Sequence, residues 1–400
     1  MIKTQTLKGF RDFLPVDAIR RQRVIATMKS VFAQFGFDPL ETPALEYADT
    51  LLGKYGDEAD KLLYIFEDRG GRKVGLRYDQ TVPASRVVAQ YGNTLAMPFK
   101  RYQVQPVWRA ENPQRGRYRE FLQCDIDIFG EASYMADAEI IVTVGKTIER
   151  LGLTNYSILI NDRMLFGDAP LGAIMVIDKI KKIGVEGVQK ELTDKGFDPS
   201  LLSTIKANKP SQRLQQIIDA VQSLGISKEH LIFDPTLARG LDYYTSTIFE
   251  VELGEYEAGS IGGGGRYDKL IGQFTGKDVP AIGFAFGFDR LLEAMIQAQL
   301  LPSITTEAQV YVSVFAKDLL SSSLAITSQL RNAGIATDMC MNVDMKLEKQ
   351  LKFAAAKGVP YVIIQGPDEA DRNIVQLKNL STKTQEELTV DQVIEKLRSN

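Results

Sequence analysis

The chain has 400 residues and a net charge of −3, with 44% hydrophobic and 25% charged residues. This composition is typical of a globular protein, and the length predicts two or three domains. There is no apolar run of roughly 18 residues, which excludes a transmembrane helix, and no apolar stretch at the N-terminus, which argues against secretion. Because the net charge is slightly negative, any contact with nucleic acid must be local.

Cysteine and histidine are too scarce for several kinds of catalytic or metal site. Cys124 and Cys340 lie far apart and form no CxxC pair, which excludes a cysteine zinc site and fits a reducing cytoplasm. His230 is the only histidine, so histidine-based general-base catalysis and histidine-rich metal sites are nearly excluded. We assign no metal-ligating residue from the sequence.

The first ninety residues predict a helix, an extended segment and two strands. Apolar residues recur on one side of a helix over about 15–35, and prolines favour an extended chain over 37–46. Two short strands then flank a turn at 68–71. Asp79 and Thr81, which follow, can either hold an ammonium group or cap the next helix, and their spacing leaves both interpretations open.

Residues 100–130 predict an antiparallel hairpin, because two alternating runs, 102–108 and 117–129, flank a loop that contains proline and glycine. Asp125 and Asp127 share one face near the end of the second run and can accept a cation. The planar forks of arginine suit phosphate groups, although a solvated hairpin of mixed charge is the simpler interpretation. The loop and its flanks carry Lys100, Arg101, Arg109, Arg115, Arg117 and Arg119.

A helix over 133–151 and a strand over 156–161 follow the hairpin. Lysine-rich segments with helical periodicity then predict a helical insertion over roughly 165–230. Strand patterns return at 231–234 and, with many aromatic and β-branched residues, at 239–250.

Four glycines at 262–265 are not followed by the Lys-Ser/Thr pair of a phosphate-binding loop, so we exclude such a loop. They predict a strand whose bare backbone lies against a bound molecule. The segment 281–290 then runs as a strand into a helix over 291–299, with Arg290 at the junction.

The last hundred residues predict a separate small α/β domain, because strand and helix patterns alternate there after a linker at 301–306. One helix face in this domain is basic. Its lysines are Lys346, Lys349, Lys352 and Lys357.

Several of these segments resemble the motifs of class II aminoacyl-tRNA synthetases. The run from Trp108 to Glu111 together with Arg119-Glu120-Phe121 resembles motif 2, and the glycine-rich strand ending at Asp289-Arg290 resembles motif 3. The segment around Pro43 is similar to motif 1, which builds the homodimer interface of this class.

The resemblance is closest to the histidyl-tRNA synthetase family, in the strings RGRYREFLQCDIDIFG, LRYDQTVPASRV and ARGLDYYT, and it covers nearly the whole chain. The string KLEKQLKFAAAKGVPYVIIQG resembles the anticodon-binding domain of this family. At two positions this chain carries a residue other than the one usual in the family, and both changes are small. These residues are Gln80 and Ser246.

The resemblance implies an α+β fold: an antiparallel-sheet catalytic domain with a helical insertion, and a C-terminal α/β anticodon-binding domain. The expected limits are 1–164 and 231–302 for the two parts of the catalytic domain, 165–230 for the insertion and 307–400 for the last domain. The implied function is ATP-dependent attachment of L-histidine to its tRNA through a histidyl adenylate, by a cytoplasmic homodimer without membrane contact. Magnesium should accompany ATP, with ligands that cannot be assigned.

The resemblance also implies the roles of individual residues. Arg109 and Arg239 are the expected catalytic cations. The expected histidine-binding residues are Asp79, Thr81, Arg109, Gln123, Asp127, Arg239, Tyr243 and Tyr244. The expected ATP-binding residues are Arg109, Glu111, Arg117, Phe121 and Arg290.

Two rival functions remain. One is a catalytically silent, histidine-sensing paralogue of the ATP phosphoribosyltransferase regulatory subunit type, which loses several of these residues and usually lacks the C-terminal domain. The other is a class II synthetase for proline, threonine or glycine, against which ARGLDYYT and the pair Gln123 and Asp127 argue.

Overall fold

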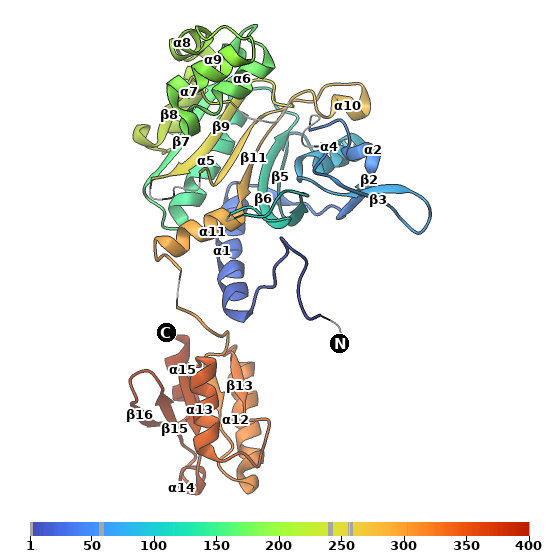
Figure 1. Ribbon diagram of the computed structural model, residues 1–400. Coiled ribbons are helices and arrows are strands. Elements are labelled where there is room, and N and C mark those ends of the chain that lie inside the picture. Colours follow the sequence, from blue (N-terminus) through green and yellow to red (C-terminus); the bar gives the residue numbers. More distant parts are fainter. Residues whose placement is uncertain are drawn as a thin grey trace. The chain divides into compact units, whose positions relative to one another are not determined.

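The computed structural model describes residues 3–55, 60–114, 116–238, 243–254, 256, 259–301 and 303–399 (Figure 1). Contacts divide the chain into two compact units. The first contains the N-terminal segment up to Asp12 and Val24–Leu301, and the second contains Phe13–Arg23 and the chain beyond Leu301. Both units contain helices, and each has its own sheet, which confirms the α+β class.

An eight-stranded sheet forms the centre of the first unit, in the order β1-β5-β6-β11-β10-β9-β7-β8. The inner strands pair antiparallel, whereas the edge strands β1 and β8 run parallel to their neighbours. The strands are β1 (Asp38–Pro39), β5 (Phe99–Trp108), β6 (Glu120–Phe129), β7 (Tyr156–Asp162), β8 (Leu231–Phe233), β9 (Thr247–Leu253), β10 (Gly262–Arg266) and β11 (Ala281–Gly287).

Helices and a small second sheet complete this unit. Figure 1 shows α6 to α9 grouped beside β7 and β8, and β2 and β3 lying near α4. The small sheet has the order β2 (Leu45–Tyr47), β4 (Lys73–Leu76), β3 (Tyr64–Glu67). The helices are α1 (Pro15–Gln34), α2 (Ala48–Leu51), α4 (Thr81–Tyr91), α5 (Tyr134–Arg150), α6 (Leu171–Ile177), α7 (Ile180–Asp194, interrupted at Gly184), α8 (Leu201–Lys206), α9 (Gln212–Ser223), α10 (Gly272–Thr275) and α11 (Phe288–Gln297).

Alternation along the strands of the large sheet separates two apolar cores. On one face, Cys124, Ile126 and Ile128 of β6 pack in a core with residues of α1, α5, α9 and α11. On the other face, Leu159 and Ile248 pack in a core with residues of α4, α6, α7 and α8. In β6 this second face carries polar side chains at 123, 125 and 127 instead of apolar ones, so the middle of the sheet there is the polar floor of a site.

The second unit is built on a five-stranded sheet in the order β13-β12-β14-β15-β16. Strand β12 runs parallel to β13 and β14, and β15 and β16 add antiparallel. The strands are β12 (Val310–Val312), β13 (Thr337–Met339), β14 (Tyr361–Ile364), β15 (Val375–Asn379) and β16 (Gln385–Leu388), and the helices are α12 (Leu320–Asn332), α13 (Leu347–Lys357), α14 (Pro367–Asp371) and α15 (Val390–Arg398).

Most predicted elements are confirmed, including the hairpin β5–β6 and the helical character of the region between β7 and β8. The strand predicted over 239–250 is confirmed from Thr247, where β9 begins, and is wrong at residues 243–246, while residues 239–242 lie outside the described residues. Helix α11 begins at Phe288, three residues earlier than predicted, and α4, expected from about residue 84, begins at Thr81. Strand β16 was not predicted, because its exposed residues show no apolar alternation.

A buried ion pair joins the large sheet to the helices on one of its faces. Arg266, at the end of β10, donates to Asp137 of α5 at 2.5 Å, and Arg213 of α9 donates to the same carboxylate at 3.0 Å. Arg266 also donates to the carbonyl oxygens of Glu131 and Ser133. Both members of the central pair are 2% exposed or less.

Asp137→Asn should lower the free energy of unfolding of the first unit by up to about 3–5 kcal/mol. It removes the buried counter-charge of Arg266 and leaves this guanidinium only the partly exposed carboxylate of Asp268, 3.2 Å away. Urea denaturation would measure the change. The exposed pair Lys181–Glu252, 2.6 Å apart, is the control, since Glu252→Gln should cost about 1 kcal/mol or less. Equal losses in the two variants would contradict a structural role for the buried pair.

Candidate active site

A cavity of about 380 Å³ opens over the polar floor of β6. Its walls come from β6, β10, β11, the β5–β6 loop and the first turns of α4 and α11. The cavity brings together every predicted site residue that the structure describes, while Arg239 lies outside the described residues. These lining residues are Asp79, Thr81, Arg109, Glu111, Arg117, Phe121, Gln123, Asp127, Tyr243, Tyr244 and Arg290.

Asp79 stands at the start of α4 and is buried. Its carboxylate accepts hydrogen bonds from the backbone N–H of Val82 at 3.0 Å, the hydroxyl of Tyr55 at 3.1 Å and the hydroxyl of Tyr243 at 3.4 Å. Burial raises the pKa of Asp79, and the hydrogen bond from Val82 and the charge of Arg109 oppose this rise. The hydrogen bond from Val82 agrees with the capping interpretation of Asp79, and its place in the cavity leaves the ammonium-binding interpretation a prediction.

Asp127 lies at the same end of the cavity, on β6, and is 2% exposed. One carboxylate oxygen accepts a short hydrogen bond from the hydroxyl of Tyr267, and the other lies 2.6 Å from Nη2 of Arg101. Burial raises the pKa of Asp127, whereas Arg101 and Tyr267 lower it. Gln123 lies four residues earlier on the same face of the strand.

Three residues that contact the buried carboxylates of the cavity were not identified from the sequence. They are Arg101, Tyr267 and Tyr55. We grouped Arg101 with the arginines of the hairpin loop and its flanks, but its side chain is fully buried and lies across the ladder from Asp127. The hairpin register carries this information, and the alternating pattern alone does not fix that register. Tyr267 directly follows Arg266 at the end of the glycine strand, and this position is the sequence feature that could have identified it as a site residue.

Arg109 directly follows β5 and lines the cavity. Its guanidinium carbon lies 4.2 Å from the ring centre of Tyr78 and 5.1 Å from that of Phe121, and its Nε donates to the carbonyl oxygen of Tyr78 at 3.2 Å. Two aromatic rings and a hydrogen bond therefore hold this cation in place before any ligand arrives.

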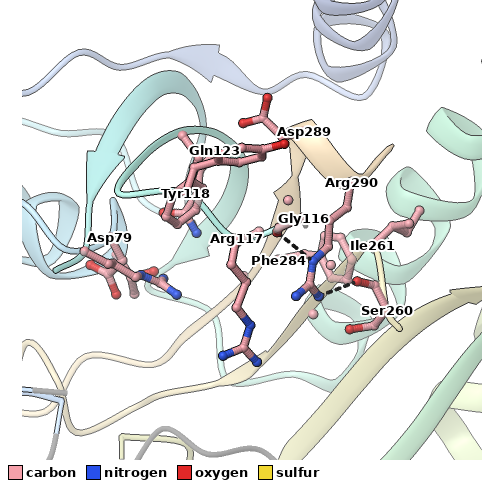
Figure 2. A pocket seen from close by; sticks show the side chains of 18 of the residues that line it. Asp79, Gly116, Arg117, Tyr118, Gln123, Ser260, Ile261, Phe284, Asp289 and Arg290 are labelled. Carbon is pink, nitrogen blue, oxygen red and sulfur yellow. Dashed lines mark hydrogen bonds between the residues drawn. The ribbon is translucent and has the colours of Figure 1, made fainter. Parts of the chain in front are cut away.

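Arg290 and Arg117 supply positive charge at the other end. Figure 2 shows Arg290 beside Gly116 and Ser260, whose carbonyl oxygens accept hydrogen bonds from it at 3.4 and 3.1 Å. Arg117 pairs with Glu111 at 3.6 Å, and about half of its side chain remains exposed. The cavity therefore has the buried carboxylates of Asp79 and Asp127 at one end and the guanidinium groups of Arg117 and Arg290 at the other. The second end also contains Glu111 and Asp289, each of which pairs with an arginine.

Glycines allow the strands around the cavity to approach closely. Gly262 lines the cavity, and a Cβ there would come within 2.6 Å of the carbonyl oxygen of Ala285. A Cβ on Gly283 would overlap the carboxylate of Asp127. The glycine strand was predicted to lie against a ligand, and the structure adds that neighbouring strands and Asp127 also require glycine at these positions.

This arrangement suits a small molecule that carries hydrogen-bond donors at one end and meets a phosphate-bearing molecule at the other. Within the part of the chain that the structure describes, no group of three or more His, Cys, Asp or Glu residues could hold a metal ion. The same residues include no helix long and apolar enough to cross a membrane.

Comparison with known proteins gives two family matches. Residues 9–172 and 177–291 match the family described as histidyl-tRNA synthetase, and residues 309–400 match the anticodon binding domain. The first match alone covers more than half of the chain. The second falls on the small α/β unit built around β12 to β16.

Full-length relatives carry the same name. The histidine–tRNA ligase of Rhodopirellula baltica is 39% identical over 97% of this chain and 96% of that protein, and the one from Cytophaga hutchinsonii is 35% identical over 99% and 100%. Among solved structures, the histidyl-tRNA synthetase of a Nostoc species superimposes with a TM-score of 0.88 at 29% identity, covering all of both chains.

These matches leave the silent-paralogue alternative less supported, because the relatives that match over the full length are named as ligases. The C-terminal match points the same way, because that alternative usually lacks the domain. The chain therefore belongs to the histidyl-tRNA synthetase family of class II aminoacyl-tRNA synthetases.

Proposed function

We propose that the chain activates L-histidine with ATP in the cavity over β6 and passes the histidyl group to the 3′-terminal adenosine of its tRNA. The observation that carries this proposal is the polarity of the cavity, with Asp79 and Asp127 at one end and Arg109, Arg117 and Arg290 beyond them. An amino acid and a nucleoside triphosphate can meet there with complementary charges.

At the histidine end, Asp79, Thr81 and Gln123 hold the ammonium group, while Asp127 and Tyr244 contact the two imidazole nitrogens. The burial of both carboxylates supports these roles, because buried polar groups select strongly for a ligand that satisfies them. Such a site discriminates against analogues that lack the matching groups by roughly 10⁴-fold or more, so it needs no editing domain.

At the ATP end, Phe121 stacks on the adenine and Arg290 covers its other face. Glu111 accepts from the adenine amino group or orients the loop through Arg117, with which it pairs at 3.6 Å. Arg117 contacts the phosphates. We propose that magnesium enters with ATP, held by phosphate oxygens and water, since Mg²⁺ typically keeps several waters and few protein ligands.

In the first step the histidine carboxylate attacks the α-phosphorus and pyrophosphate leaves. Negative charge grows on the phosphate oxygens, so cations fixed beside them lower the barrier. We assign this role to Arg109 and Arg239. The contacts of Arg109 with Tyr78 and Phe121 support its part, because a pre-positioned cation needs no reorganisation during the reaction.

We also propose a homodimer, because large apolar side chains of the small sheet are exposed: Leu45 (44%), Tyr47 (62%) and Phe66 (45%). A cytoplasmic location is proposed from the two cysteines, which are buried and unpaired with each other. We propose domain limits of 1–164 and 231–302 for the catalytic domain, 165–230 for the insertion and 307–400 for the anticodon-binding domain.

Helix α13 of the last domain offers a surface for tRNA. Lys346, Lys349, Phe353 and Lys357 recur at helical intervals of three and four, so they form one stripe. Phe353 is 48% exposed, and its ring centre lies 5.8 Å from that of Tyr311. A rigid aromatic ring among lysines suits an unpaired base and its phosphates, which is the chemistry of an anticodon loop.

Amino-acid specificity gives the first test of the proposed function. We expect histidine-dependent exchange of pyrophosphate into ATP, with no comparable exchange for proline, threonine or glycine, because Asp127 and Tyr244 satisfy an imidazole ring. The measurement is the exchange rate with each amino acid in turn. Equal exchange with any of the other three would exclude the histidine assignment.

The catalytic cations give the second test. Arg109→Ala and Arg239→Ala should each reduce single-turnover adenylation by at least about 10²-fold. Binding of histidine and ATP should change much less, because the contacts strengthen mainly in the transition state. Arg69→Ala, in the exposed turn between β3 and β4, is the control. Near-normal adenylation by either variant would assign that arginine a structural role.

The α13 stripe gives the third test, in the full-length chain. Changing Lys346 and Lys349 to Ala should weaken tRNA binding and flatten its salt dependence by nearly one log–log unit per lost phosphate contact. Phe353→Ala should weaken binding by about 1–3 kcal/mol and leave the salt slope unchanged, since stacking carries no charge. Pyrophosphate exchange should stay normal in both variants.

Lys383→Ala, on the exposed turn between β15 and β16, is the matched control for the loss of a lysine. Unchanged tRNA affinity and charging by the stripe variants would place the anticodon contact elsewhere.

A further inference from the structure

Beside the proposed histidine end lies a group of polar residues that does not line the cavity. The hairpin register pairs Arg101 with Asp127 and Gln103 with Asp125. The side chains of Arg101, Gln103 and Asp125 are 1% exposed or less. Arg101, Gln103 and Asp125 therefore place further charged and polar groups beside Asp127 on the same face of the sheet, in a buried position that is apolar in most sheets.

Arg101 is committed to one of the two carboxylates. Its Nη2 lies 2.6 Å from Asp127, its Nη1 donates to the side chain of Gln103 at 3.1 Å, and Nη2 also faces the carbonyl oxygen of Gln80 at 3.4 Å. The guanidinium thus balances the charge of Asp127 and keeps that carboxylate an acceptor.

Asp125 has no such counter-ion. Neither of its oxygens receives a hydrogen bond from the described residues. The charged groups near it are Arg101 on β5, Asp127 on its own strand, Asp79 before α4, Arg109 beyond β5 and Arg77 beyond β4. Because Arg101 already binds Asp127, an ionised Asp125 would stay buried and unpaired, which is strongly unfavourable.

Two amide side chains near Asp125 have oxygen atoms that would accept a hydrogen bond, so a hydrogen-bond donor suits this region better than a further acceptor. The side-chain oxygens of Gln80 and Gln123 are buried and receive no hydrogen bond from the described residues. Gln123 stands two positions from Asp125 on the same face of β6, and the amide nitrogen of Gln80 donates to the carbonyl oxygen of Gln123. A protonated Asp125 brings an O–H group to this region. Burial raises the pKa of Asp125 well above its usual value, which agrees with the neutral form.

We propose that Arg101 and a neutral Asp125 form a positioning pair for the imidazole of histidine. Arg101 keeps Asp127 ionised and directed at one imidazole N–H, and Asp125, by staying neutral, leaves the guanidinium entirely to Asp127. This inference rests on the proposed histidine site.

The charge balance determines which form of the imidazole ring the site accepts. Asp127 and Arg101 together are neutral, so the floor offers a hydrogen bond without net charge and suits the neutral ring. Histidine binding should therefore weaken as the pH falls through the pKa of the imidazole, about 6.5. Without Arg101, burial would raise the pKa of Asp127 further, so this carboxyl group would stay ionised only when a bound imidazolium ring supplies the missing positive charge.

The test is the KM for histidine and for ATP in pyrophosphate exchange, measured from pH 5.5 to 8.5. Arg101→Met should raise the KM for histidine by about 10-fold or more at pH 8, leave the KM for ATP within about 2-fold, and shift the optimum for histidine binding to lower pH. Arg101→Lys, which keeps the charge, should restore most of the affinity. Asp125→Asn should resemble the wild type within about 2-fold, because it replaces a neutral acid with a neutral amide of the same shape.

Asp137→Asn controls for the general cost of breaking a buried ion pair, and it should lower stability without moving the pH profile. An unchanged KM and pH profile in Arg101→Met would overturn the role of Arg101. A loss of histidine affinity in Asp125→Asn as large as in Asp127→Asn would overturn the neutral state of Asp125. This second comparison tests the proposal even if Arg101→Met fails to fold. Absence of histidine exchange by the wild type would instead refute the proposed function.

Discussion

The ion pair between Arg101 and Asp127 is the constraint around which the centre of this molecule is arranged. Two opposite charges buried in a sheet are favourable only with close geometry and full hydrogen bonding. The fold supplies the close geometry: Arg101 lies across the ladder from Asp127, Tyr267 donates to the same carboxylate, and Gly283 leaves room for it. Hydrogen bonding is not complete, because Nε of Arg101 has no partner among the described residues. Contacts within the protein offset the free energy of burying these charges, so they hold the carboxylate of Asp127 in its orientation before any ligand binds.

The two ends of the cavity use charge in different ways. At the carboxylate end the polar groups are buried and held by tyrosine hydroxyls, which favours selection among similar ligands. At the other end Arg117 is half exposed and Arg290 holds two backbone carbonyls. These contacts are weaker and reach solvent, which suits a substrate whose phosphates must enter and leave. Selectivity and turnover are therefore separated along one cavity.

Local patterns in the sequence predicted the elements well, and contacts between elements poorly. The hairpin, the long helices and the α/β unit follow from alternation and helical periodicity, which short windows contain. The family motifs named eleven residues that the fold brings into one cavity. Arg101, Tyr55 and Tyr267 escaped notice because their roles depend on which residue lies opposite them. The strand prediction was wrong at residues 243–246 because aromatic and β-branched content describes burial as much as strand geometry. Tyr243, for example, is buried beside the cavity without being part of β9.

The register of β5 and β6 links folding to specificity. Cys124, Ile126 and Ile128 face an apolar core, so the side chains between them must face the cavity side of the sheet. A slip of one residue would bury Asp125 and Asp127 in that core and expose the apolar set, so the core excludes it strongly. The same apolar packing that stabilises the sheet therefore also keeps Arg101 and Asp127 on the cavity side, and the hairpin register places them opposite each other. In the proposed histidine site, the placement of Asp127 therefore depends on residues of the apolar core, and a substitution at Ile126 should alter histidine binding through the ladder alone.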